Sequence, residues 1–307
     1  MSGTSRSPAR ATLLIVFSAC CFGSIPILIT LAIGSGARLI DALVWRYAIA
    51  ALLLMIVSGG IGALRVPRGR AIPLLVLAGG GQAAMAFMSL SALRYIPAAS
   101  LTFLRYTYPA WVAAIAAIRG TEPLTGPRVT ALALSLAGLA LMVGMPGSGG
   151  LHPIGVLLAL TAALLYALYI PMINHLGSAI PPAVTSSYAT AGAAIALVAA
   201  SLLQGGPRFN LPALSWLSIG LLAVVSTVLA FIAFLRGLAA IGPVRTAIIG
   251  AVEPFWTALL GSVVLGQQLG PRTFAGGTLI AAAVIVIQLR RPNESRRGLR
   301  AWNPRAR

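Results

Sequence analysis

The sequence predicts an all-α integral membrane protein with ten transmembrane helices, arranged as two inverted repeats of five helices. Of the 307 residues, 59% are apolar and only 8% are charged, whereas a soluble domain carries about 25% charged residues. The apolar runs reach about 20 residues, which is the length of helix that crosses a bilayer. In addition, proline and tryptophan residues recur at a constant offset of 145 residues.

Five apolar runs in the first half each predict a spanning helix. The first run is interrupted by Gly23 and Pro26, and the second and fourth contain Arg46 and Arg105. Arginine-rich and glycine-containing loops separate the runs, as expected of segments that lie outside the membrane. The five spans are expected at residues 12–33, 40–58, 71–92, 98–118 and 128–145. They make up a first repeat over residues 12–145.

The second half repeats this rhythm. Residues 146–152 begin with Pro-Gly-Ser-Gly-Gly and predict a flexible connector between the halves. A second repeat is expected over residues 153–289, with spans at 153–174, 181–203, 213–235, 246–266 and 273–289. Residues 1–11 and the basic tail 290–307 contain no spanning run, and an even number of spans puts both on the same side of the membrane.

The positions of the arginines predict the topology. All 22 basic residues are arginine. If the N-terminus is cytoplasmic, sixteen of them face the cytoplasm and four face the other side, while Arg46 and Arg105 remain inside spans. This asymmetry follows the positive-inside rule. We therefore expect a multi-pass protein of the bacterial inner membrane with both termini cytoplasmic. The net charge of +18 favours contact with anionic membrane lipids and does not indicate nucleic-acid binding.

The internal repeat predicts where a substrate would bind. Four pairs of special residues match at the offset of 145: Pro26 with Pro171, Pro109 with Pro254, Trp111 with Trp256, and Gln82 with Thr227. Because each repeat has an odd number of helices, the two copies must lie upside down relative to each other. Inverted repeats are typical of secondary transporters, whose substrate site lies at mid-membrane between the repeats.

The paired prolines predict interruptions of spanning helices. Proline removes a backbone N–H and leaves the carbonyl four residues earlier without its helical partner. In a bilayer such carbonyls need neighbouring helices, hydroxyl groups or a water-filled cavity. The candidate hinges are Pro26, Pro109, Pro171 and Pro254. The alternative is that these prolines only kink the helices for packing.

Charged residues inside the spans are the main candidates for function. A carboxylate such as Glu253 costs about 2.5–3.5 kcal/mol at the centre of a span, so it is expected to face a cavity or a partner. Arg105 and Tyr108 share a face of the fourth helix, and Tyr108 is the repeat-mate of Glu253. We therefore expect an Arg105–Glu253 ion pair. Arg46 is the second candidate partner, or it extends to the membrane surface. A paired Glu253 would hold the structure or contact substrate, whereas an unpaired one could carry a proton.

Aromatic and polar residues extend the list of cavity candidates. Tyr166, Tyr169 and Asn174 lie on the sixth helix, and the two repeat-related tryptophans could stack on a substrate or pack within the bundle. The expected substrate-binding or coupling residues are Glu253, Arg105, Tyr108, Gln82, Tyr166, Tyr169, Trp111, Trp256 and Arg46. The glycine-rich segment 79–81 lacks the Gly-Lys-Ser/Thr ending of a phosphate loop. We expect no cofactor and no metal ion.

Several motifs resemble the EamA-type branch of the drug/metabolite transporter superfamily. The first half contains Phe22-Gly23-Ser24, Trp45-Arg46-Tyr47, Pro109 and Glu122-Pro123-Leu124-Thr125, and the second contains Glu253-Pro254 and Leu265-Gly266-Gln267-Gln268-Leu269. Gln267 stands where that family usually has a glutamate, and Thr121 separates Gly120 from Glu122. The resemblance covers about residues 12–289. It implies ten helices, cytoplasmic termini, and export or uptake of small metabolites.

These observations favour a secondary transporter, with export of amino acids or similar metabolites as the first expectation. No ATP-binding motif is present, so an ion gradient or the substrate gradient would drive transport. A facilitator channel or a non-transporting scaffold is an alternative. A membrane enzyme acting on lipid-linked substrates is disfavoured, because the four acidic residues and two histidines are scattered along the chain. A chain that already contains both repeats could work as a monomer, with a homodimer as the other expectation.

Overall fold

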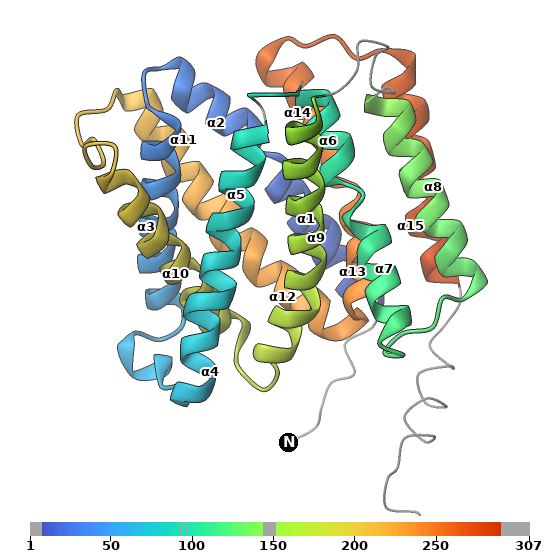
Figure 1. Cartoon of the computed structure of the whole chain (residues 1–307), viewed down its shortest axis with the longest axis horizontal. Coiled ribbons are helices and arrows are strands. Elements are labelled where there is room, and N and C mark those ends of the chain that lie inside the picture. The colour runs from blue at the N-terminus through green and yellow to red at the C-terminus, as the bar shows by residue number, and fades with distance from the viewer. Residues whose placement is uncertain (1–7, 93, 97, 144–151, 290–307) are drawn as a thin grey trace, which may run out of the picture.

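The computed structural model describes residues 8–92, 94–96, 98–143 and 152–289, and within them every regular element is helical (Figure 1). In this described part, nine helical spans are long and apolar enough to cross a membrane, and Gly126–Met142 forms a shorter tenth. The predicted all-helical membrane architecture is therefore confirmed. The predicted tail 290–307 lies outside the described residues, as does the predicted connector up to residue 151.

The first five spans agree with the predicted positions to within a few residues. The largest shift is at the start, where the first helix begins at Pro8 and not at residue 12. Proline suits the first position of a helix, because its missing N–H would have no partner there. The elements are α1 (Pro8–Gly23), α2 (Ile25–Gly34), α3 (Leu39–Val57), η1 (Ile61–Leu64), α4 (Arg68–Pro73), the π-helical η2 (Leu74–Gly79), α5 (Gly80–Ala92), α6 (Ala98–Arg105), α7 (Tyr108–Ile118) and α8 (Gly126–Val143).

The second five spans repeat the same plan. The elements are α9 (Pro153–Leu176), α10 (Pro182–Leu202), α11 (Ala213–Ala223), the π-helical η3 (Val224–Leu229), α12 (Ala230–Ile241), α13 (Pro243–Gly250), α14 (Glu253–Leu265) and α15 (Pro271–Leu289). His152 caps α9, and its Nδ1 accepts a hydrogen bond of 3.3 Å from the backbone N–H of Ile154. The third span of each half contains a π-helical segment, a feature that is often found at functional sites.

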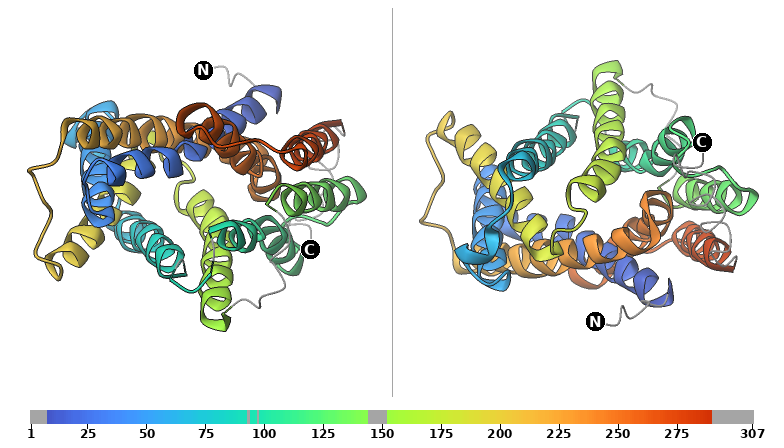
Figure 2. Two further views of the ribbon diagram at one scale, coloured as in Figure 1. Left: turned by 90° about the horizontal axis from the view of Figure 1, so that it is seen from above. Right: turned by 90° about the horizontal axis from the view of Figure 1, so that it is seen from below.

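The two halves are inverted and pack against each other through equivalent pairs. In Figure 1, α1 begins at the lower end of the molecule and α9 begins at the upper end. Helix α1 packs on α12, and its counterpart α9 packs on α5. Three further contacts join equivalent spans, namely α3 with α10, α7 of the fourth span with α13 of the ninth, and α8 with α15. Figure 2 shows the α8–α15 pair at one end of the long axis and α3 and α10 towards the other.

Prolines interrupt three of the four helices in which they were expected to do so. The first span breaks between Gly23 and Ile25, directly before Pro26. The fourth and ninth spans break at matching positions, with Pro109 and Pro254 in the first turns of α7 and α14. Helix α9 runs through Pro171 without a break, and α5, α6 and α7 pack against it.

A polar cluster around Asp41 ties two loops together at the upper end of the molecule. Asp41 is fully buried and accepts hydrogen bonds from Arg38 Nε at 2.8 Å, Arg38 Nη2 at 2.7 Å and the backbone N–H of Arg208 at 3.1 Å. Arg38 also donates to the carbonyl oxygens of Gln204 and Gly206. The loop before α3 is therefore joined to the loop between α10 and α11.

Asp41→Asn is expected to lower the free energy of unfolding in detergent by about 3 kcal/mol. Removing one partner of a buried ion pair costs about 3–5 kcal/mol, and the Arg38 side chain is 28% exposed, which places the loss at the lower end of that range. Thermal unfolding in detergent would measure the change. Arg38→Gln is expected to cost at least as much, because it leaves the fully buried Asp41 carboxylate with backbone donors but no counter-charge. A parental melting temperature for Asp41→Asn would contradict this account of the cluster.

Candidate functional site

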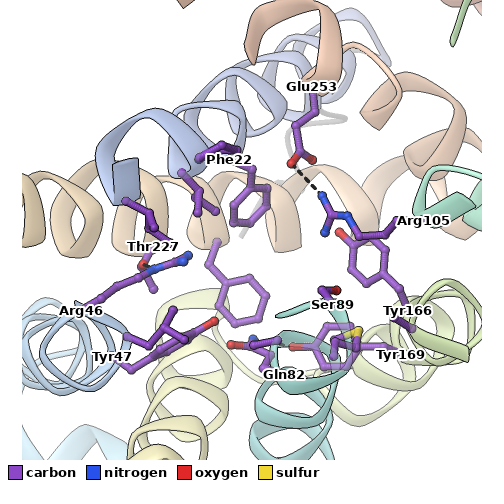
Figure 3. Close-up of a pocket in the computed structure, with 18 of the residues that line it drawn as sticks. Phe22, Arg46, Tyr47, Gln82, Ser89, Arg105, Tyr166, Tyr169, Thr227 and Glu253 are labelled. Atoms are coloured by element: carbon purple, nitrogen blue, oxygen red, sulfur yellow. Dashed lines mark hydrogen bonds and ion pairs between the residues drawn. The ribbon is translucent and has the colours of Figure 1, made fainter. Parts of the chain in front are cut away.

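A cavity of about 260 Å³ lies between the two halves (Figure 3). Seven of the ten spans contribute to its lining. The polar and charged lining residues are Arg46, Tyr47, Gln82, Ser89, Arg105, Tyr106, Tyr166, Tyr169, Thr227 and Glu253. Small-molecule sites are typically concave and largely apolar with a few converging polar groups, and this cavity has that character.

The helix breaks of the fourth and ninth spans bring Arg105 and Glu253 together. Arg105 is the last residue of α6, and Glu253 is the first residue of α14. The Nη2 atom of Arg105 lies 3.5 Å from Glu253 Oε1, so the expected ion pair is present. Arg105 Nη2 also donates to the Tyr106 hydroxyl at 3.1 Å, and that hydroxyl is hydrogen-bonded to Glu253. The N-terminus of α14 further favours a negative charge at this position.

Arg46 lies on the opposite side of the cavity and does not reach the membrane surface. Only 6% of this residue is exposed. Its Nε donates to Thr227 Oγ1 at 2.8 Å, and its Nη2 donates to the carbonyl oxygen of Ser226 at 3.2 Å. Both acceptors belong to the π-helical η3. The expectation that Arg46 extends to the surface is therefore wrong, because a hydroxyl and a carbonyl group in the interior hold the guanidinium.

The tyrosines of the sixth span form one wall of the cavity. The Tyr169 hydroxyl accepts a hydrogen bond of 2.8 Å from Gln82 Nε2. The Tyr169 ring stacks on the Tyr166 ring, with 6.3 Å between the ring centroids. Tyr108 packs edge-on against Tyr166 at 4.6 Å, but it is only 4% exposed. Its hydroxyl donates to the carbonyl oxygen of Ala247 at 3.3 Å. Tyr108 therefore supports the wall from behind and does not line the cavity.

The two tryptophans lie outside the cavity lining. Trp111 is 40% exposed on α7, and Trp256 lies against Gly23 where α1 meets α14. Asn174 borders a separate hollow near the end of α9, together with Gly177 and Arg236. Of the four candidate hinge prolines, only Pro26 lines the cavity.

A model of the EamA-like transporter family matches residues 9–144 and again residues 153–289. The chain belongs to this family. The two matches coincide with the two five-helix halves, so each half by itself corresponds to the family model. This EamA-family chain is thus a multi-pass membrane protein with a lipid environment and a small-molecule substrate.

The relatives of this EamA-family chain agree with that assignment. It is 26% identical to the uncharacterized transporter YcbK of Bacillus subtilis (strain 168) over 276 residues, which cover 86% of this chain and 88% of the relative. A solved structure with the description "Crystal structure of protein" superposes on this chain with a TM-score of 0.76 at 20% sequence identity. That superposition covers 92% of this chain and 97% of the other, so the two share a fold.

Sequence reasoning missed several lining residues of this EamA-family site. The third spans present equivalent faces, with Gln82, Ala86 and Ser89 on one side of the cavity. The offset of 145 residues relates these to Thr227, Phe231 and Phe234, which also line it. Extending the Gln82–Thr227 match by four and seven residues along each helix would have found them. Tyr47 and Tyr106 directly follow the two arginines of the cavity, and their positions carried no comparable signal.

The polar side chains of the described residues can be compared with the groups that ligate metals. The described residues contain no group of three or more His, Cys, Asp or Glu side chains that could hold a metal ion together. The polar groups of the cavity are instead arginine, tyrosine, serine, threonine, glutamine and one carboxylate. Such groups bind and orient a polar solute through hydrogen bonds and charge.

Proposed function

We propose that this protein is a secondary transporter that moves small metabolites, with amino acids as the first class to test, by alternating access. The observation that supports this most directly is the cavity between the two inverted halves, which contains the Arg105–Glu253 pair and Arg46. Charged groups at the interface of inverted repeats are typical of transporter substrate sites. Export is the proposed direction.

Polar contacts at both ends of the bundle support the alternating-access mechanism. At the upper end, Arg38 and Asp41 hold the loop between α10 and α11. At the lower end, Glu122 forms an ion pair of 2.9 Å with Arg128 and accepts a hydrogen bond from the backbone N–H of Val244. Burial raises the pKa of the Glu122 carboxyl, and Arg128 opposes that shift. Opening either end would break one of these contacts while the other remains.

The interrupted helices supply the proposed hinges. The breaks before Pro26, Pro109 and Pro254 all lie beside the cavity. Thr257 links the break in the first span to the break in the ninth. Its hydroxyl lies within hydrogen-bond distance of the carbonyl oxygens of Gly23 (2.9 Å) and Glu253 (3.0 Å). Rotation at these breaks would move parts of both repeats around the site. The arginine distribution supports a cytoplasmic location for the lower end of Figure 1 in the proposed inner-membrane protein.

A flux screen in proteoliposomes tests the proposed function. The purified protein would be offered amino acids, nucleobases and amphipathic drugs at two pH values, with protein-free liposomes and Trp111→Leu as controls. Because Trp111 does not line the cavity, that variant is expected to transport at the parental rate. Saturable flux of at least one compound would support the transporter. If the folded protein transports none of these compounds, the result would favour a non-transporting scaffold.

The same assay separates a transporter from a facilitator channel. A transporter that alternates between two states is expected to show counterflow, in which unlabelled substrate on one side accelerates uptake of labelled substrate from the other. A channel would show flux that is independent of a pH gradient and of counter-substrate.

The assay also compares the flux of reconstituted monomer with that of reconstituted dimer. The chain contains both repeats, so a monomer could transport by itself.

A further inference from the structure

The cavity contains one positive charge that no acidic side chain of the described residues balances. The whole chain has only four acidic residues. Asp41 pairs with Arg38, Glu122 pairs with Arg128, and Glu253 pairs with Arg105. The fourth, Glu294, lies outside the described residues. Two arginines and one carboxylate therefore line the cavity, and Arg46 is the arginine that has no counter-charge in the described part.

Arg46 retains hydrogen-bonding capacity towards the cavity. A guanidinium has five N–H donors, and the hydrogen bonds to Thr227 and Ser226 use two of them. The acceptors are neutral, so they orient the group without balancing its charge. In Figure 3, the Arg46 guanidinium lies across the cavity from Arg105 and Glu253. Because a buried charge is costly without a partner, an anion entering the cavity would be stabilised there.

The repeat indicates that this charge is not part of the common scaffold. The offset of 145 residues places Ala191 at the position equivalent to Arg46. By contrast, Gln82 and Thr227 are equivalent to each other and both are polar. Helix packing at this point therefore does not require a charged side chain. The remainder of the cavity lining near Arg46 is largely apolar, with Ile29, Leu43 and Phe231 among its members.

We propose that Arg46 binds the carboxylate of a transported organic monoanion whose apolar body lies against the aromatic wall of the cavity. This inference rests on the proposed transport function and names the substrate class of that site. A guanidinium pairs with a carboxylate through two parallel hydrogen bonds. One unbalanced positive charge matches a monocarboxylate and not a phosphate dianion. Arg105 and Tyr106 already engage Glu253, so the substrate needs no amino group.

The test uses four probes that share a phenyl body and differ only in the charge of the head group. They are 3-phenylpropanoate, phenylalanine, 3-phenylpropanamide and 2-phenylethylamine, representing an anion, a zwitterion, a neutral amide and a cation. Binding to the purified parent protein in detergent would be measured by isothermal titration calorimetry at neutral pH. The anion is expected to bind at least about tenfold more tightly than the amide and the amine. This ranking requires no variant, so misfolding cannot confound it.

Two variants assign the preference to Arg46. Arg46→Gln is expected to reduce the affinity for 3-phenylpropanoate by about tenfold or more and to leave the affinity for 3-phenylpropanamide unchanged. Arg46→Lys keeps the charge but not the paired donors, so an intermediate loss is expected. Equal binding of all four head groups, or unchanged binding of the anion by Arg46→Gln, would overturn the inference. Failure of every probe to bind the parent would also overturn it, while flux of another compound would leave the proposed function standing.

Discussion

Transport by the Glu253→Gln variant is expected to fall by about tenfold or more relative to the parent protein. The substitution leaves the Arg105 guanidinium without its counter-charge beside the cavity. Breaking a buried ion pair costs about 3–5 kcal/mol, and the 39% exposure of the Arg105 side chain reduces that cost. A residual penalty of only about 1.4 kcal/mol in the transport cycle corresponds to a tenfold effect. The measurement is flux of a substrate identified by the proteoliposome screen.

A double variant separates the charge balance from the role of the carboxylate itself. Arg105→Gln combined with Glu253→Gln removes both charges and is expected to recover the melting temperature of the parent without recovering flux. If the double variant also regains flux, the pair only holds the structure. Parental flux in Glu253→Gln alone would show that the carboxylate has no part in transport.

The pH dependence of the same proteins tests coupling. If Glu253 carries a proton during the cycle, parent flux should depend on a pH gradient and the flux that remains in Glu253→Gln should not. The ion pair of Glu253 with Arg105 favours a structural or substrate-contacting role over proton transfer. We therefore expect the two proteins to show the same dependence on pH, at different absolute rates.

Gly192→Ala is expected to lower the stability of the protein by about 3 kcal/mol or more, because α10 and the third span are in backbone contact there. A Cβ atom on Gly192 would overlap the carbonyl oxygen of Leu75 in the π-helical η2. A Cβ atom on Gly79 would lie 2.5 Å from the Cα of Gly192. Overpacking costs about 1–3 kcal/mol in soluble cores, and here the obstructing atoms belong to backbone that cannot rotate away. Small residues allow this close approach of helices in membranes.

The neighbouring glycine provides a matched control for this effect. Gly80 is adjacent to Gly79 in the same span, and a Cβ atom added there would meet nothing within 4 Å. Gly80→Ala is therefore expected to leave the melting temperature in detergent unchanged or slightly raised, since alanine is the better helix former. Gly79→Ala and Gly192→Ala should both lower it by several degrees. Equal melting temperatures for all three variants would show that the two helices separate without cost.

Much of the fold follows from features that are local in sequence. The ten spans follow from runs of apolar residues, because a bilayer requires about 20 such residues in a helix. The breaks of the fourth and ninth spans follow from Pro109 and Pro254, since proline cannot donate a helical hydrogen bond. The partnership of Arg105 with Glu253 follows from the repeat register, which relates the face of Tyr108 to that of Glu253. Each of these inferences needs only spacing along the chain.

Tertiary structure alone decided which side chains face the cavity. Trp111 and Trp256 match in the repeat, yet neither lines the site, because the direction of a side chain depends on how its helix is rotated against its neighbours. Arg46 lies in the second span, and only the approach of η3 brings Thr227 and Ser226 within hydrogen-bonding distance of it. The same sequence pattern is compatible with an arginine at the membrane surface. The difference arises from acceptors about 180 residues away in the chain, which no local pattern can place.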